Sequence, residues 1–362
     1  MYRTDGTTPA CMCVASGCFS RRGFLGGTLA LGGAALLPGS GLRAQAAATD
    51  VAKPHRIDVH HHFATPDWVA AVSGRERLNP RTRTWTPARS IEEMDRNGVA
   101  AGMLSITNPG LWFGDAAATQ TLARACNDVA ARLARDYPGR FGVFAAMPMP
   151  DAEASLREIE YAYDQLKCDG IGLFTSYADR WLGNAAFSPV FEELNRRRAL
   201  VFVHPTAASC CGNLIAELPA SMIEYGTDTT RAIGSLLATG TAARYPDIRY
   251  IFSHAGGTAP YLIYRLLRLE QTLPEQAQRL PHGVLHELRK FHYDVAGAAH
   301  PLPLSALLKL VPVSQVLFGT DYPSAGGIAD VLKGLAECGF DAATMRAIER
   351  DNAIRLLPRL NA

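Results

Sequence analysis

The chain has 362 residues, of which 48% are hydrophobic and 19% are charged, with 36 basic and 34 acidic residues. This is the composition of a globular protein, and the length is sufficient for one large core that covers both faces of a sheet. The near balance of charge, without a long basic run, excludes a surface suited to nucleic acid. No nucleic-acid partner is therefore expected.

The N-terminal segment has the order of features found in bacterial export signals. Arg21-Arg22 precede a weakly apolar stretch rich in Gly and Ala at residues 24–37, and the small residues Ala44-Gln45-Ala46 follow. A stretch of about 14 residues of this kind is too short and too weakly apolar for a membrane anchor. The order resembles a twin-arginine signal. We expect residues 1–46 to be removed and residues 47–362 to form a periplasmic protein that has no membrane association after signal removal.

Cysteine usage favours structural thiols over a disulfide framework. Five of the eight cysteines follow the expected signal: Cys126, Cys168, Cys210, Cys211 and Cys338. An odd count without a repeated spacing is a poor disulfide framework, and no Cys-x-x-Cys pair indicates a thiolate zinc site. Buried cysteines are therefore expected, with the adjacent Cys210 and Cys211 close to the candidate site described below.

Short apolar runs alternate with helical patterns through most of the chain. The expected strands are residues 56–60, 99–106, 141–147, 170–174, 200–204, 248–254, 291–295 and 315–320. The expected helices are residues 116–136, 152–166, 189–198, 229–244, 259–273, 302–310, 328–337 and 342–357. This alternation predicts a parallel sheet, and eight repeats favour an α/β fold closed into a (β/α)8 TIM barrel, a single domain after the signal. Two irregular segments, residues 75–89 and 206–225, are expected to overhang the carboxyl ends of the strands.

Four of the expected strands end in, or next to, a histidine or an aspartate. Alternation places His60 and His62 on one face of the first strand, while His204, His254 and Asp321 mark the ends of the fifth, sixth and eighth strands. Because the carboxyl ends of barrel strands share one mouth, these side chains are expected to converge. A single such histidine is more often packed in a core than bound to an ion. Together, imidazoles and a carboxylate suit a divalent transition metal, with zinc first among them.

Four motifs surround these residues: Ile57-Asp58-Val59-His60-His61-His62-Phe63, Phe202-Val203-His204-Pro205, Ser253-His254-Ala255-Gly256-Gly257 and Gly319-Thr320-Asp321-Tyr322-Pro323. They resemble the amidohydrolase superfamily, and most closely its decarboxylase branch, which includes aminocarboxymuconate-semialdehyde decarboxylase and the hydroxybenzoate decarboxylases. The resemblance runs from residue 56 to the C-terminus. Segments 142–150, 169–174 and 187–198 resemble the 6-methylsalicylate decarboxylases of this branch. An amidohydrolase-type barrel is implied.

By this resemblance His60, His62, His204 and Asp321 bind the metal, and His254 stands beside it as an acid/base. Three imidazoles and one carboxylate leave Zn²⁺ an open position for water or substrate. Relatives with Glu in place of the first histidine are associated with manganese, so His60 favours Zn²⁺ while Mn²⁺ is the alternative. Residues 170–177 contain no lysine, which disfavours a two-metal site bridged by a carboxylated lysine.

The implied function is metal-dependent, non-oxidative decarboxylation of a small aromatic carboxylic acid of the 2-hydroxybenzoate or 6-methylsalicylate type. A metal that holds the phenolate and carboxylate oxygens orients the ring while the carboxylate-bearing carbon takes a proton and CO₂ leaves. We expect Asp321 to deliver the proton and His254 to hold and recharge it, with the reverse assignment left open.

Substrate contacts are expected from aromatic residues and one arginine. Phe63, Trp85, Trp112 and Phe318 are candidates to sandwich an aromatic ring, with core packing the favoured role for Phe318. Arg265 matches an arginine that, in aminocarboxymuconate-semialdehyde decarboxylase, resembles a carboxylate clamp lent across a dimer interface. An exposed place on a helix is the equally weighted alternative for this arginine. The resemblance also implies a homodimer.

Two other functions are consistent with the same residues. A hydrolase on this scaffold would use a metal-bound hydroxide to open a lactone or to cleave an ester or amide, and the ligand residues do not separate it from a decarboxylase. The second alternative is an exported metal-binding protein without catalytic activity. A protein that only binds a metal does not need a further histidine beside the ligands, so the presence of His254 disfavours this alternative.

Overall fold

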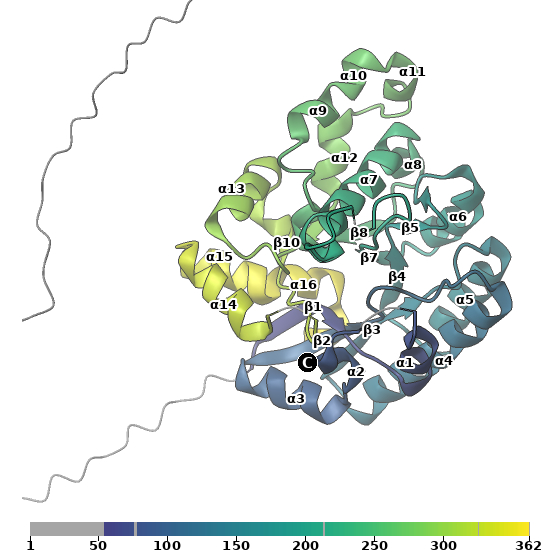
Figure 1. Ribbon diagram of the computed structural model, residues 1–362. Coiled ribbons are helices and arrows are strands. Elements are labelled where there is room, and N and C mark those ends of the chain that lie inside the picture. The colour runs from purple at the N-terminus through teal and green to yellow at the C-terminus, as the bar shows by residue number, and fades with distance from the viewer. Residues whose placement is uncertain (1–53, 76–77, 213, 325, 362) are drawn as a thin grey trace, which may run out of the picture. The chain divides into compact units, whose positions relative to one another are not determined.

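The computed structural model describes residues 54–75, 78–212, 214–324 and 326–361. The predicted export signal at residues 1–46 lies outside these described residues. Among the helices of the described ranges, none combines the length and the apolar character needed to cross a membrane. Figure 1 shows the arrangement of the elements.

Eight parallel strands form the central sheet, in the order β1-β2-β3-β4-β7-β8-β9-β10. Backbone hydrogen bonds join the first strand to the segment that directly follows the last strand, because the Val59 N–H donates to the Phe318 carbonyl at 3.0 Å and the His62 N–H to the Tyr322 carbonyl at 2.7 Å. The sheet is therefore a nearly closed barrel, as predicted. The strands are β1 (Arg56–His62), β2 (Val99–Ser105), β3 (Phe141–Ala146), β4 (Gly170–Phe174), β7 (Leu200–His204), β8 (Arg249–Phe252), β9 (His292–Asp294) and β10 (Val316–Leu317).

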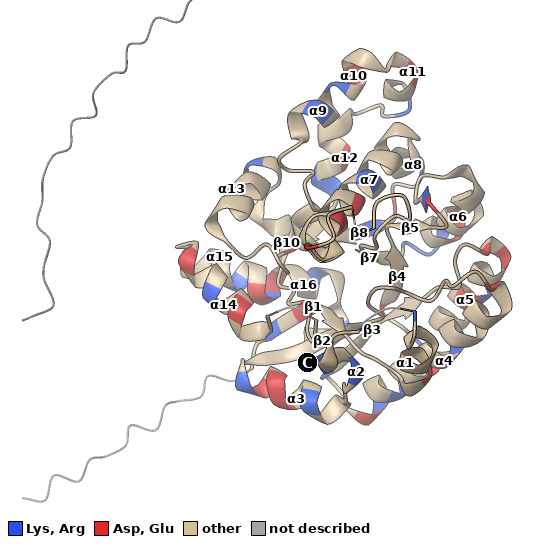
Figure 2. Ribbon diagram, in the orientation of Figure 1, with Lys and Arg blue, Asp and Glu red and all other residues tan. Residues whose placement is uncertain are grey.

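Helices surround this barrel, and a short hairpin of β5 (Ser176–Tyr177) and β6 (Arg180–Trp181) follows β4. Blue and red segments alternate along outer helices such as α3 and α14 in Figure 2, whereas the barrel strands are mostly tan. The helices are α1 (Pro66–Val72), α2 (Pro80–Arg83), α3 (Pro87–Arg96), α4 (Ala116–Asp136), α5 (Ala152–Asp164), α6 (Ser188–Arg196), α7 (Glu224–Ala238), α8 (Thr241–Arg244), α9 (Ile263–Leu267), α10 (Leu269–Thr272), α11 (Pro274–Ala277), α12 (Val284–Lys290), α13 (Pro301–Leu310), α14 (Ile328–Glu337), α15 (Ala342–Arg346) and α16 (Asn352–Leu356).

Local sequence explains where these helices begin and end. In α4 the Asp115 side chain accepts the Ala118 N–H, a cap that stabilises a helix by about 1 kcal/mol. The predicted helix at residues 229–244 is divided at Gly240, which has φ +72° and would clash with Arg279 if it carried a Cβ. The predicted helix at residues 259–273 is likewise divided, into the short helices α9 and α10.

The segment at residues 75–89, predicted to be irregular, contains α2 and the start of α3. The Asn79 side chain accepts the Arg81 N–H at the start of α2, and the Thr86 side chain accepts the Arg89 N–H at the start of α3. Each cap is followed by proline at the first helical position, which is a recognised helix-start pattern. The pairs Asn79-Pro80 and Thr86-Pro87 were therefore the signals that the prediction missed.

One extra residue in β1 changes which side chains face the barrel interior. Asp58 pairs with Gly102 and His61 with Leu104, so three steps along β1 match two along β2. Val59 belongs to the apolar cluster of the barrel interior, and His60 faces inward after it. Such bulges re-aim side chains beside functional sites.

The C-terminal segment closes the amino-terminal end of the barrel. The Arg359 guanidinium bonds the Asp169 carboxylate at 2.6 Å and the Phe141 carbonyl at 3.5 Å, so the chain crosses from β10 to the starts of β3 and β4. Leu356 and Leu360 of this segment join the interior apolar cluster. The mouth with the strand carboxyl ends lies at the other end of the barrel.

His292, the first residue of β9, should make folding stability depend on pH. Burial lowers the pKa of His292 to about 4, whereas an unfolded histidine titrates near 6.5. Between these values the unfolded chain binds a proton that folded His292 does not, so stability falls as pH drops. The expected loss is about 2 kcal/mol between pH 6.5 and 4.5. Chemical denaturation at both pH values should show a smaller loss in His292→Gln, and equal losses in the two proteins would contradict this assignment.

Candidate metal and catalytic site

Four side chains bring one possible ligand atom each to within 4.8 Å of one another: His60, His62, His204 and Asp321. His60 Nε2 lies 3.0 Å from His62 Nε2. Asp321 Oδ1 lies 3.0 Å from His62 Nε2, 3.3 Å from His60 Nε2 and 4.0 Å from His204 Nε2. The three histidines come from β1 and β7, and Asp321 follows β10, so the cluster lies at the carboxyl ends of the strands.

A hydrogen-bond acceptor behind each imidazole fixes its orientation. His60 Nδ1 lies 2.9 Å from Asp294 Oδ2, His62 Nδ1 lies 3.2 Å from the Ser105 carbonyl, and His204 Nδ1 lies 2.9 Å from its neighbouring Pro205 carbonyl. An acceptor at Nδ1 holds the ring proton there and leaves a lone pair on Nε2. Three Nε2 atoms and one carboxylate oxygen therefore face a common point.

The cluster has the unsatisfied polar atoms that a cation would satisfy. His204 Nε2 and Asp321 Oδ1 are buried without a hydrogen-bond partner. The facing Nε2 lone pairs of His60 and His62, only 3.0 Å apart, repel each other unless a proton or a metal ion lies between them. Because unpaired buried polar atoms are costly, this donor set fits a divalent metal ion.

Burial and neighbouring carboxylates set the protonation of the imidazoles in opposite directions. Burial lowers the pKa of His62, and that of His204 well below its ordinary value, so both are neutral at pH 7 and able to bind a metal. Burial opposes charge on His60 too, but the Asp294 and Asp321 carboxylates raise the pKa of His60 to about 10. A metal ion that binds here must therefore displace the proton from His60.

Asp321 is an anion at neutral pH. Burial raises its pKa, but the charge on His60 and the close imidazoles of His254, His60 and His62 bring the pKa of Asp321 well below its ordinary value. Its Oδ1 faces the three ligand imidazoles, whereas Oδ2 lies 3.6 Å from His254 Nε2. One oxygen of the Asp321 carboxylate therefore lies at the histidine cluster, and the other lies beside His254.

His254 stands beside the four-residue cluster rather than within it. Its ring centroid is 5.0 Å from that of His60 and 5.9 Å from that of His204. His254, Ala255 and Asp321 have φ values of +55°, +56° and +59°, a region that residues other than glycine rarely adopt and that concentrates at functional sites. The backbone is therefore strained at His254 and at Asp321, on both sides of the cluster.

Asp294 is a site residue that the sequence reasoning missed. Its Oδ2 bonds His60 Nδ1 at 2.9 Å, and its Oδ1 accepts the His254 N–H at 3.1 Å and the Ala296 N–H at 2.9 Å. The available signal is the single carboxylate within the expected strand at residues 291–295. Asp294 thus connects a candidate ligand to the segment that carries His254.

Asp58 connects the first strand to the segment that follows the last one. Its Oδ1 accepts the His60 N–H at 3.1 Å and the Thr320 N–H at 3.0 Å, and its Oδ2 accepts the Thr320 hydroxyl at 2.5 Å. The ring of His61 lies 3.0 Å from the same Oδ2 and points away from the cluster. Asp58 therefore holds the backbone beside both His60 and Asp321.

The predicted substrate contacts occupy different environments. Phe63 is buried and packs edge-on against half-buried Trp85, with 6.1 Å between the ring centroids. Trp112 is half-buried in the loop that follows β2, and Arg265 is exposed on α9. The structure brings Phe63 and Trp85 together, while substrate roles for these four residues stay predictions.

Phe318 does not occupy the position expected of a substrate contact. Leu317 belongs to the interior cluster, and a Cβ on Gly319 would lie 2.9 Å from the His60 Cβ. Since side chains alternate along a strand, Phe318 points the opposite way, where it is fully buried in the cluster between strands and helices. Its role is core packing.

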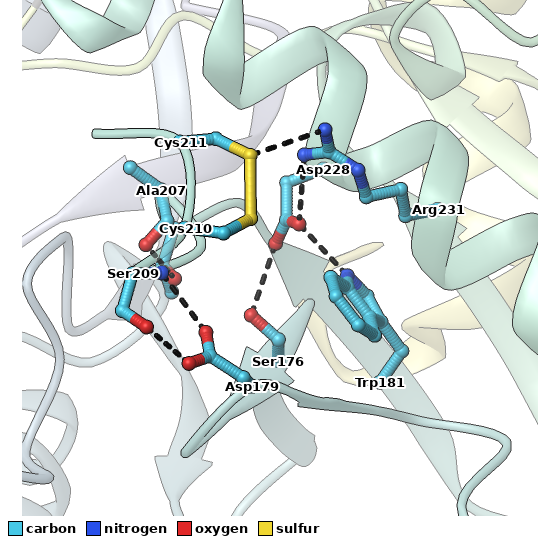
Figure 3. The surroundings of a disulfide bond; sticks show 10 residues. Ser176, Asp179, Trp181, Ala207, Ser209, Cys210, Cys211, Asp228 and Arg231 are labelled. Carbon is cyan, nitrogen blue, oxygen red and sulfur yellow. Dashed lines mark hydrogen bonds and ion pairs between the residues drawn. A yellow bond between two sulfur atoms is a disulfide. The ribbon is translucent and has the colours of Figure 1, made fainter. Parts of the chain in front are cut away.

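The segment after β7 contains a disulfide that the sequence did not predict. Cys210 and Cys211 are bonded to each other, and Arg231 Nη2 lies 3.7 Å from Cys211 Sγ (Figure 3). Cys210 is exposed and Cys211 half-buried, so the expectation of buried free thiols is wrong for this pair. The expectation of buried free thiols is confirmed for Cys126 and Cys168.

Asp228 of α7 fixes the chain on one side of His204. Its carboxylate accepts hydrogen bonds from the Ser176 hydroxyl at 3.1 Å and from Trp181 Nε1 at 2.8 Å (Figure 3). It also accepts the hydroxyl of Thr175, whose N–H donates to the His204 carbonyl at 3.0 Å. This buried carboxylate therefore supports the backbone that carries His204.

Replacement of Asp294 by Asn should weaken metal binding. The amide keeps the size of the side chain but removes the negative charge that orients His60, and changes of this kind typically cost about 10- to 100-fold in metal affinity. Competition with a chromophoric chelator would measure the loss for Zn²⁺ and Mn²⁺. The control is Asp341→Asn at the exposed start of α15, and equal affinities in the two variants would rule out the role given to Asp294.

Comparison with known proteins agrees with this architecture. The family model described as Amidohydrolase matches residues 57–359. The chain is 35% identical over 313 residues to 6-methylsalicylic acid decarboxylase of Penicillium expansum, covering 84% of this chain and 97% of the relative. It is 28% identical over 272 residues to 2-amino-3-carboxymuconate-6-semialdehyde decarboxylase of Dictyostelium discoideum, covering 74% of each.

Solved structures have the same fold. The 5-carboxyvanillate decarboxylase of Sphingomonas paucimobilis superposes with a TM-score of 0.76 at 20% identity, covering 84% of this chain and 99% of that one. A manganese-bound dihydroxybenzoic acid decarboxylase of Polaromonas sp. JS666 gives 0.74 at 22% identity, covering 85% and 98%. From the match of the family model and the identity with the Penicillium enzyme, the chain belongs to the amidohydrolase family.

Proposed function

We propose that this protein is a metal-dependent, non-oxidative decarboxylase of a small aromatic carboxylic acid of the 2-hydroxybenzoate class, such as 6-methylsalicylate. The observation that supports it best is the set of three Nε2 atoms and one carboxylate oxygen within 4.8 Å, with His254 alongside. The named decarboxylases among the relatives, at 35% and 28% identity, support a carboxy-lyase.

We propose Zn²⁺ as the ion, with Mn²⁺ as the alternative. Three imidazoles and one carboxylate are donors that zinc prefers, whereas two solved decarboxylases of this fold carry manganese. His60, His62, His204 and Asp321 would hold the ion. When bound, it would act as a Lewis acid that fixes the carboxylate and phenolate oxygens of the substrate.

The protein's own residues would move the proton. Asp321 Oδ2 lies 3.6 Å from His254 Nε2, so His254 can supply a proton that Asp321 passes to the ring carbon bearing the carboxylate. The bond from that carbon to the carboxylate then breaks, its electron pair restores the aromatic ring, and CO₂ leaves. Because Asp321 is an anion at neutral pH, it depends on His254 for each proton.

Export and self-association are separate proposals. The order of Arg21-Arg22, apolar stretch and small residues supports delivery to the periplasm by the twin-arginine route, which cell fractionation measures.

Large apolar side chains exposed at Leu214, Met222, Tyr261 and Tyr264 support a homodimer, which sedimentation equilibrium measures. Arg265 directly follows Tyr264, so a dimer contact there would include it.

The purified, metal-loaded protein should release CO₂ from 2-hydroxybenzoates and should stop when a chelator removes the ion. His254→Asn should lower kcat by at least about 100-fold, because a general acid is lost, while metal binding is retained. The matched control is His286→Asn, which replaces an exposed histidine of α12.

Two results would contradict the proposal. Turnover of lactones or esters without CO₂ release from any aromatic acid would indicate a hydrolase on the same scaffold. Tight metal binding without turnover of either substrate class would indicate a metal-binding protein that is not an enzyme.

A further inference from the structure

The bonded pair of Cys210 and Cys211 has two unlike ends. Cys210 is exposed, whereas Cys211 is half-buried. A small molecule in solution therefore reaches the sulfur of Cys210 more easily than that of Cys211. Thiol–disulfide exchange begins when a thiolate attacks one of the two sulfur atoms, so access favours attack at Cys210.

Opposite charges lie beside the two ends of the pair. On the Cys211 side, Arg231 Nη2 donates a hydrogen bond to Cys211 Sγ at 3.7 Å (Figure 3). On the Cys210 side, the Asp179 carboxylate accepts the Ser209 N–H at 2.9 Å and also the Ser209 hydroxyl (Figure 3). These hydrogen bonds lower the pKa of Asp179, so its carboxylate is negative at neutral pH. A thiolate is therefore favoured at Cys211, beside a cation, over Cys210, near an anion.

The positive charge of Arg231 is available to a sulfur anion. Arg231 Nη1 is buried without a hydrogen-bond partner and lies 3.6 Å from Asp228 Oδ1. The Asp228 carboxylate already accepts hydrogen bonds from the Ser176 hydroxyl at 3.1 Å and from Trp181 Nε1 at 2.8 Å. Asp228 therefore has its own donors without Arg231, and the guanidinium can bind a thiolate at Cys211.

The turn that carries the pair is held by contacts other than the disulfide. The Cys211 N–H donates to the Ala208 carbonyl at 2.9 Å, and the Thr206 N–H donates to the Thr175 hydroxyl at 3.0 Å. Neither hydrogen bond involves a sulfur atom, so both can persist when the disulfide opens. The two sulfur atoms then stay close enough to bond again.

We propose that Cys210 is a site of reversible modification by small thiols. A thiolate attacks Cys210 Sγ and forms a mixed disulfide with it. The bond between the two cysteines breaks, and its electron pair leaves with Cys211 Sγ as a thiolate beside Arg231. In the reverse step this thiolate attacks Cys210 Sγ and releases the small thiolate. One disulfide replaces another in each direction, so neither step needs an oxidant. The proposal does not depend on the reaction that the protein catalyses.

The test is a brief exposure of the protein, purified without reductant, to 2-mercaptoethanol, a thiol with no other charged group. Iodoacetamide then alkylates the free thiols and prevents the reverse step, and peptide mass spectrometry locates both modifications. The mixed disulfide should lie on Cys210 and the alkyl group on Cys211. The opposite placement, an equal mixture or no mixed disulfide would overturn the proposal. Alkylation of both cysteines without added thiol would also overturn it, because the pair would then not be bonded.

A variant tests the part assigned to Arg231. Arg231→Gln removes the cation beside the leaving sulfur and should slow formation of the mixed disulfide about three- to tenfold, since one charge-assisted hydrogen bond to a partly charged sulfur is lost. It should also allow more attack at Cys211. The matched control is Arg135→Gln, which removes the same charge from an exposed position of α4 and should keep the wild-type rate. Equal rates in Arg231→Gln and Arg135→Gln would overturn the part assigned to Arg231.

Discussion

The hydrogen bond between His60 Nδ1 and the Asp294 carboxylate is the contact on which the candidate site depends most. It lies entirely in the protein interior, where both side chains are fully buried. By holding a ring proton on Nδ1 it turns Nε2 toward the Nε2 atoms of His62 and His204. The same carboxylate accepts the backbone N–H of His254. One buried carboxylate therefore orients the His60 ring and the backbone of His254.

The second constraint is the seam of the barrel. Asp58 receives hydrogen bonds from β1 and from Thr320, and this contact places Asp321 opposite His60 and His62. The positive φ of Asp321 turns its carboxylate back toward β1, at an energetic cost that the buried contacts around it offset. The hydrogen bonds that close the barrel therefore also set the position of Asp321 relative to His60 and His62. A substitution that loosens the seam would disturb both.

Much of the fold was accessible from the sequence because its buried strands are short apolar runs. Strands 170–174 and 200–204 and helices 116–136 and 328–337 have the predicted bounds, since Gly, Pro or polar residues flank each of them. The convergence of strand ends followed from the shared mouth of a barrel. The division of the helix at Gly240 was not visible, because the close approach of Arg279 is a tertiary contact.

The details of the site were harder to predict for physical reasons. The bulge in β1 depends on pairing with β2, so strict alternation could not show that Val59 and His60 both face inward. Phe318 was a candidate substrate contact with core packing as the favoured role, and the choice between the two depends on an orientation that only the structure gives. Asp294 gave a visible signal, a charge within an apolar run, whose partner 234 residues earlier in the chain could not be read from the sequence.

The distance along the chain between the candidate ligands has a consequence for folding. His60 and His62 lie near the start of the barrel and Asp321 near its end, so the complete donor set exists only after long-range strand pairing has joined β1 to β10. Contacts of this kind form slowly, because a large loop must close first. The chain must therefore reach its native topology before the four side chains can act together as one donor set. The identity of an ion bound by the proposed site would then depend on the metals that surround the chain when folding finishes.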